Sequence, residues 1–107
     1  MLLVCRFSPD DEADFLVRAR RAVGLLAAQP NCERVDLARA VEAPGQWVLV
    51  AVFASLTDYR RALSPFDVRE HVVPFLSEAS TADQAVFERN TTALPDGGWV
   101  EHPSILG

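Results

Sequence analysis

The feature that most constrains this chain of 107 residues is the segment Trp47–Phe53, WVLVAVF. Its seven residues are all apolar, and three of them are valine. A run this short and this rich in β-branched residues predicts a strand, and the lack of alternation predicts a strand buried on both faces. One domain of this length has room for about two helices beside a small sheet, enough to cover one face. The other face therefore needs a partner, and we expect a homodimer.

The first third of the chain predicts a strand followed by a helix. Residues 2–7, LLVCRF, are apolar through Cys5 and predict another buried strand. Ser8 and Pro9 precede three carboxylates, a pattern typical of a helix start because it satisfies the free amides and the helix dipole. The helix is expected over residues 9–28, with a buried face formed by Phe15, Ala19, Ala22, Val23 and Leu26. We expect Arg18, Arg20 and Arg21 to lie on the solvent-exposed face of this helix and not to form a binding patch.

A hairpin is predicted around the central strand. Residues 33–41 alternate between apolar and polar side chains, which is typical of an edge strand. Pro44 and Gly45 are placed for the centre of a type II turn. The turn therefore joins this edge strand to Trp47–Phe53.

The second half predicts an interrupted helix, a short strand and a tail. The helix is expected to begin after Ser55, to break at Pro65 and to bend or end at Pro74. Its buried side is expected to use Tyr59, Leu63, Val68, Val72, Phe75 and Leu76. Residues 84–89 mix apolar and charged side chains and predict a second edge strand. Residues 91–107 contain too much Pro and Gly to suggest regular structure.

The predicted order is strand, helix, strand, strand, helix, strand. The first and third strands are apolar on both faces, so they belong in the middle of the sheet. That placement gives the sheet order 4-1-3-2 and an α+β, ferredoxin-like βαββαβ domain over residues 1–90, followed by a tail at residues 91–107.

Composition and charge exclude several classes of function. The net charge is −5, so an acidic surface would repel phosphate backbones, and we expect no nucleic-acid partner. No apolar run approaches the roughly 20 residues that cross a bilayer, and the N-terminus lacks a basic leader, so we expect a cytoplasmic protein with no membrane partner. The two cysteines are expected to be free thiols. No phosphate loop, metal-ligand spacing or hydrolase triad is present, and no metal or cofactor is expected.

Three segments, LLVCRF, WVLVAVFASLTDYRRAL and SPFDVREHVVPFLSEA, resemble the antibiotic biosynthesis monooxygenase superfamily of dimeric α/β barrels. The resemblance covers roughly residues 1–90. It implies a dimer in which two sheets pack face to face and a ligand site between sheet and helices. Members include cofactor-free oxygenases of polyketide quinones and haem-degrading oxygenases. Of the Asn, Trp and His that hold haem in the latter, only the His is matched, at His71; Arg6 and Ala62 stand at the other two positions.

Five residues are the candidates for a site. The resemblance makes His71 the candidate catalytic residue, as a base toward a phenol or a haem ligand. The alternative is that His71 is a partly exposed histidine on a helix with no role in a site. Arg6 interrupts an apolar strand and is a candidate for substrate binding, although an ion pair with Glu88 or Asp36 is the preferred interpretation. The side chains of Tyr59, Phe66 and Phe75 are candidates to line a binding site for a flat aromatic substrate. The alternative is that they belong to the hydrophobic core.

Three functional hypotheses follow. The first is a cofactor-independent monooxygenase that acts on a small aromatic, polyketide-type substrate. The second is a non-catalytic dimer that binds a small ligand, and the third is a haem-binding variant. The tail is expected to pack at the dimer interface, because an idle terminus would not need Trp99, Val100, Ile105 and Leu106. The alternative is a loosely ordered end that packs on its own chain.

Overall fold

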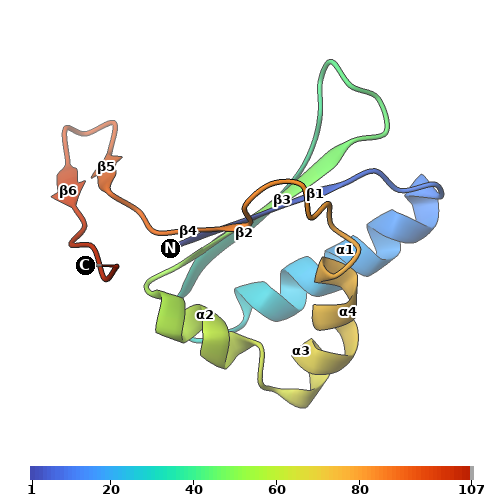
Figure 1. Cartoon of the computed structure of the whole chain (residues 1–107), viewed down its shortest axis with the longest axis horizontal. Helices are drawn as coiled ribbons and strands as arrows, with labels where there is room; N and C mark the ends of the chain where they lie inside the picture. The colour runs from blue at the N-terminus through green and yellow to red at the C-terminus, as the bar shows by residue number, and fades with distance from the viewer. Residues whose placement is uncertain (107) are drawn as a thin grey trace.

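The structure is a computed structural model, and it describes residues 1–106. Figure 1 shows its elements in chain order: β1 (Leu2–Phe7), α1 (Glu12–Ala27), β2 (Cys32–Arg39), β3 (Trp47–Phe53), α2 (Leu56–Ala62), α3 (Phe66–His71), α4 (Val73–Leu76), β4 (Val86–Phe87), β5 (Thr91–Ala93) and β6 (Trp99–Glu101). The first four strands form an antiparallel sheet in the order β2-β3-β1-β4. This confirms the ferredoxin-like α+β fold and the predicted order 4-1-3-2.

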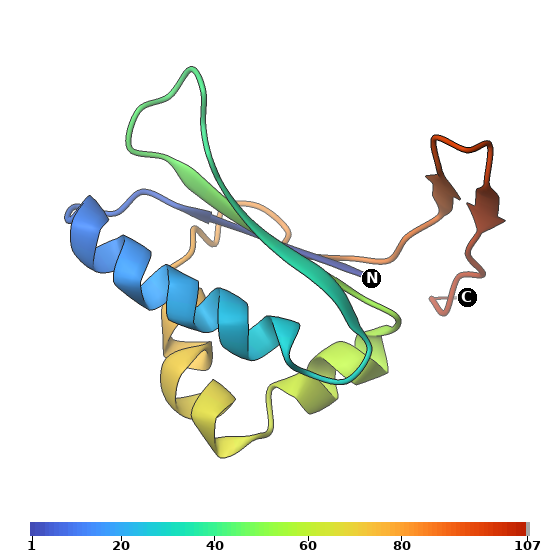
Figure 2. The same ribbon diagram turned by 180° about the vertical axis from the view of Figure 1, so that it is seen from behind.

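The helices cover one face of this sheet and leave the other open (Figures 1 and 2). Side chains of β3 alternate between the faces, and those under the helices are fully buried: Leu49, Ala51 and Phe53. The opposite face, here called the open face, carries the apolar stripe Leu2, Val4, Val48, Val50 and Val52. The sequence predicts that both faces of β3 are buried. Within one subunit only the face under the helices is fully buried, because Val48 and Val50 on the open face are half-buried.

Helix α1 begins later than its sequence predicts. Asp11, rather than Ser8, caps it and accepts a hydrogen bond from the Asp14 backbone N–H at 3.1 Å. The predicted buried face is correct for Phe15, Ala19, Ala22 and Leu26, whereas Val23 is half-buried. The chain then leaves the helix through Asn31, whose φ of 62° is the left-handed conformation that asparagine tolerates.

Turn chemistry explains the remaining connections. Gly45 has φ 82°, and the Gln46 N–H donates to the Ala43 carbonyl at 3.2 Å, as the predicted type II turn requires. The second helical region is divided as expected: α3 begins after Pro65, and Pro74 lies in the first turn of α4. Within that region Val68, Val72 and Phe75 are buried, while Phe66 is 68% exposed.

The C-terminal segment corrects the expectation of an irregular tail. β5 and β6 form a hairpin that projects from the body of the domain (Figure 1). Gly97, with φ 91°, and the Asp96 carboxylate, which accepts from the Gly98 N–H at 2.8 Å, build its turn. The glycines thus close a hairpin and do not prevent one. β4 in turn is shorter than the predicted residues 84–89.

Candidate functional site

Four aromatic side chains form a cluster between the sheet and the helices, at the end of the domain where β1 ends and β3 begins. Phe7 stacks on Phe75 with ring centroids 4.7 Å apart, and Phe15 lies 5.3 Å from Phe7 and 5.5 Å from Phe75. Trp47 lies 5.8 Å from Phe15. We call Phe7, Phe15, Trp47 and Phe75 the aromatic cluster. Three of these rings, Phe7, Phe15 and Phe75, are buried, so the cluster is part of the core and can meet a ligand only where it borders a hollow.

An ion-pair network borders the aromatic cluster. Arg18 of α1 donates from Nε to Asp14 at 2.9 Å and from Nη1 to the Glu78 carboxylate, which follows α4. These carboxylates raise the pKa of Arg18, the Glu78 hydrogen bond contributing most. The guanidinium carbon also lies 5.8 Å from the centroid of the Phe75 ring. The network therefore links α1 to the end of α4 directly above an aromatic wall.

Three neighbouring hollows meet at Glu78. The largest, about 380 Å³, is lined by the ends of β1 and β3, and a second, about 300 Å³, by the first turn of α1 with Phe7 and Phe15. The third, about 140 Å³, is lined by Arg18, Arg21, His71 and Phe75. The first two have the volume of small-molecule sites, which begins at about 300 Å³. Glu78 lines all three.

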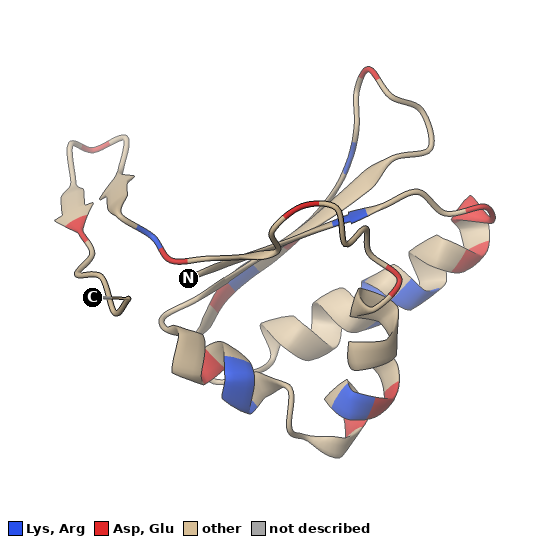
Figure 3. Ribbon diagram, viewed as in Figure 1, with Lys and Arg blue, Asp and Glu red and all other residues tan. Residues whose placement is uncertain are grey.

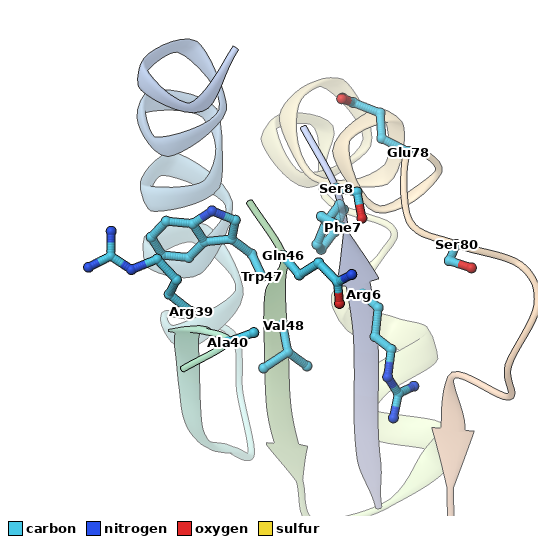
Figure 4. A pocket seen from close by; sticks show the side chains of 10 residues that line it. All are labelled: Arg6, Phe7, Ser8, Arg39, Ala40, Gln46, Trp47, Val48, Glu78 and Ser80. Atoms are coloured by element: carbon cyan, nitrogen blue, oxygen red, sulfur yellow. The ribbon is translucent and has the colours of Figure 1, made fainter. Parts of the chain in front are cut away.

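Figure 4 shows the largest of these three hollows. The Arg39 guanidinium lies over the Trp47 ring, 5.4 Å from its centroid, and is 3.7 Å from Glu12. Arg6 extends to the other side of Val48, so the two cations do not converge on one ligand atom. The indole N–H of Trp47 is buried and finds no hydrogen-bond acceptor among residues 1–106. A buried donor without a partner lowers the stability of the folded state.

Arg6 corrects the ion-pair expectation. It is half-exposed and lies 3.8 Å from Asp83, not beside Glu88 or Asp36. Asp36 is paired with Arg34 instead, at 3.1 Å. Arg6 lies on β1 and Asp36 on β2, and β3 separates these two strands in the sheet, so the two side chains are not on neighbouring strands.

His71 lies at the end of α3 and faces α1. Its Nδ1 is 3.2 Å from Arg21 Nη1. Since a guanidinium only donates, Nδ1 accepts this bond, and the proton of the neutral ring lies on Nε2. Nε2 is 4.0 Å from the Glu70 carboxylate, which is too long for a hydrogen bond. The available group of His71 is therefore an N–H donor.

The remaining candidates lie apart from the aromatic cluster. Tyr59 packs on Phe53, with ring centroids 5.6 Å apart, and burial, with a smaller contribution from Cys5, raises its pKa. Burial likewise raises the pKa of the free Cys5 thiol. Phe66 faces solvent. Of the five sequence candidates, the structure brings only His71 and Phe75 into one hollow.

Sequence reasoning missed the Arg18 and Glu78 pair. It assigned Arg18 to a solvated face, although Asp14 and Arg18 have the four-residue spacing of a helical ion pair. Glu78 is 60 residues away in the chain, and only the fold brings the two together. Figure 3 shows that the basic residues elsewhere are dispersed among acidic ones along the ribbon.

Residues 1–106 contain neither a membrane-spanning helix nor a metal-binding cluster. No helix there has both the length and the apolar character to cross a membrane. No group of three or more His, Cys, Asp or Glu side chains in this range is arranged to hold a metal ion.

The fold defines a small α+β domain of the ferredoxin-like class, and family comparison identifies its family. The family model described as antibiotic biosynthesis monooxygenase matches residues 2–72. The chain belongs to this family. A search of curated proteins finds no significant match.

Solved structures of the same fold include an oxygenase. SnoaB from Streptomyces nogalater, described as a cofactor-independent oxygenase, is 27% identical, with a TM-score of 0.68 over 88% of this chain and 95% of SnoaB. A structure bearing the family's name from Bordetella bronchiseptica is 22% identical, with a TM-score of 0.56 over 80% of this chain and 94% of the other. One from Deinococcus radiodurans is 14% identical, with a TM-score of 0.59 over 84% of this chain and all of the other, a coverage of 100%. The last two comparisons support the fold alone.

Proposed function

We propose that this protein is a cofactor-independent monooxygenase that oxidises a flat, electron-rich aromatic of the polyketide type, such as an anthrone or a dihydroquinone. The observation that carries the proposal is the aromatic cluster beneath a polar rim, in a chain similar to a cofactor-independent oxygenase over nearly the whole length of both. The substrate ring would lie along the cluster, with its polar edge toward Glu78 and Arg18.

The chemistry needs no reductant beyond the substrate. An anthrone loses a proton to give an electron-rich anion, which transfers electrons to dioxygen and forms a carbon–oxygen bond. Loss of a second proton from the same carbon then breaks the oxygen–oxygen bond. One oxygen atom becomes the quinone carbonyl, and the other leaves with two protons as water. The protein would contribute orientation in an apolar site and hydrogen bonds to the anion.

His71 would serve this reaction as a donor to a substrate oxygen. Its Nδ1 is already engaged by Arg21, so the ring offers the Nε2 proton and not a lone pair. This arrangement favours stabilising an anion over abstracting a proton. The same contact supports a second candidate function, a non-catalytic binding protein for small aromatics, because it leaves no free imidazole base in the hollow.

Haem is a poor fit to His71 as it stands. The hollow beside it measures about 140 Å³, well below the range for larger cofactors. When haem is added to the purified protein, we expect no shift of the Soret band that depends on His71, so the spectra of the unmodified protein and of His71→Ala should be the same. Appearance of such a band would favour the haem-binding variant over both candidates.

The assembly we propose is a homodimer formed through the open face. Four of the five side chains of the apolar stripe are half-buried and Val52 is buried, although no helix covers this face; an uncovered apolar sheet face is a recognised mark of an interaction surface. The hairpin of β5 and β6 would then reach the partner subunit, because Trp99 is 66% and Leu106 78% exposed on their own chain. Free thiols at Cys5 and Cys32 support a reducing, cytoplasmic location.

Oxygen uptake tests the function. Purified protein is incubated with an anthrone or a dihydroquinone in ¹⁸O₂, and the quinone is analysed by mass spectrometry. Saturable uptake with one ¹⁸O atom in the product is expected. Phe75→Leu, which keeps an apolar side chain in the core, should reduce the rate, whereas Phe66→Leu, the same change at an exposed ring, should not. Tight binding of the aromatic with no uptake above the buffer rate would favour the non-catalytic candidate.

A further inference from the structure

Arg18 is held so that one side of its guanidinium is fixed and the other is exchangeable. Nε is bonded to Asp14, one helical turn earlier on α1, at 2.9 Å. Nη1 is bonded to Glu78, which comes from a different element. The Asp14 bond orients the guanidinium plane, so the terminal nitrogens remain aligned if Glu78 departs.

Glu78 is positioned to leave. Its side chain is 47% exposed, and it follows the last helical residue of α4. A half-exposed carboxylate loses little when it turns into water, because exposed ion pairs contribute weakly to stability. Its departure would also join the three hollows that meet at this residue.

We propose that Arg18 is the residue that binds the oxyanion of the substrate, and that the Glu78 carboxylate occupies the place of that oxyanion in the free protein. The inference rests on the proposed function, because it requires an aromatic ligand on the cluster. Phe75 is almost fully buried, but it borders a hollow that Arg18 also lines, so an aromatic ring bound there would have its edge next to Arg18. Exchange of one carboxylate for one substrate anion leaves the charge around the guanidinium unchanged.

The other arginines near the site are less suitable. Arg21 is bonded to His71, and Arg6 lies beside Asp83 on the far side of the largest hollow. Arg39 covers the Trp47 ring, close to Glu12. Arg18 alone among these four contacts both Phe75 and Glu78. The site would thus select aromatics that carry an anionic oxygen at one edge.

A pair of unreactive ligands tests this selection. Anthraquinone-2-sulfonate carries a permanent negative charge, and 2-methylanthraquinone has a similar ring system without charge. Binding of each to the full-length protein is measured by equilibrium dialysis, together with the variants Arg18→Gln, Glu78→Gln and Arg39→Gln. Arg20→Gln serves as the matched control, since it removes the same charge from an exposed position of α1.

The expected result concerns the charged ligand only. Arg18→Gln should weaken sulfonate binding by about tenfold, the scale of a lost charge-assisted hydrogen bond. Glu78→Gln should strengthen it by about threefold, because the competing carboxylate is gone. Arg39→Gln should weaken it less than Arg18→Gln does, Arg20→Gln should leave it unchanged, and Arg18→Gln and Glu78→Gln should leave binding of the neutral quinone unchanged.

Three results would overturn the proposal in distinguishable ways. If both ligands bind but Arg18→Gln keeps the preference for the sulfonate, or Arg39→Gln abolishes it, Arg18 is not the anion site and the proposed function stands. If Arg18→Gln loses both ligands and also lowers the thermal midpoint, the residue is structural; Arg18→Lys should then fail to restore selectivity. If neither ligand binds the unmodified protein, the aromatic site of the proposed function is wrong, and the inference with it.

Discussion

Adjacent residues of β3 allow a direct test of the proposed dimer. Leu49 is fully buried under the helices, and Val50 is half-buried on the open face. Leu49→Ala should lower the free energy of unfolding by about 2–5 kcal/mol through the cavity it leaves in the core. Val50→Asp should instead act on association, because a valine at a partly open position contributes little to an isolated subunit.

The size of the association effect follows from burial of charge. In a symmetric dimer of Val50→Asp, the two introduced carboxylates would be buried, each at a cost of about 3 kcal/mol or more when unpaired. A total of about 6 kcal/mol weakens the dimer by about 10⁴-fold. Within one subunit the new carboxylate also lies opposite Asp36, and that repulsion costs only about 0.2–1 kcal/mol.

Sedimentation velocity across a micromolar concentration series is the measurement. The unmodified protein should sediment as a particle of about twice the 11.8 kDa chain mass, and Val50→Asp as a monomer or an aggregate. Val50→Lys should dissociate the dimer as well, although its ammonium can pair with Asp36. Val17→Asp, at a position of α1 that is 60% exposed, should leave the dimer intact. A monomeric unmodified protein, or a Val50→Asp dimer of unchanged affinity, would refute the reasoning.

Three further predictions test other parts of the structure. Truncation after Leu94 should loosen the dimer and make the fluorescence of Trp47 respond to dilution, whereas equally tight association would exclude the hairpin of β5 and β6 from the interface. Phe75→Ala should lower the free energy of unfolding in urea by about 3–5 kcal/mol, since this ring is 2% exposed within the aromatic cluster; a loss below about 1 kcal/mol would mean that the cluster is loosely packed. The raised pKa of Tyr59 means that the folded state keeps its phenol proton above pH about 10, the ordinary value; stability from this residue is therefore complete below that pH and is lost as pH rises through the folded pKa. Tyr59→Phe should flatten the fall of the urea midpoint between pH about 9 and 11, and an unchanged slope would count against a buried phenol.

Polarity patterns were sufficient for the sheet. Two strands apolar on both faces and two mixed strands place β1 and β3 in the middle, and the predicted turn at Pro44 and Gly45 puts β2 beside β3, so the order of β1 to β4 follows. Pro44, Pro65 and Pro74 marked the turn and the helix breaks because the proline ring fixes φ and removes a hydrogen-bond donor. The hairpin of β5 and β6 escaped prediction, since its glycines act through a specific turn and a composition count does not reveal that.

The site was decided by tertiary structure. Sequence alone determined that Phe15 and Phe75 face the core, because helical periodicity assigns each to a buried face. It could not determine that their rings meet Phe7 and Trp47, or that Arg18 reaches Glu78, because these contacts join distant segments through the packing of α1 against α3 and α4. Periodicity tells which way a side chain points from its own helix or strand. What it meets there depends on how the elements cross, and only the folded chain contains that information.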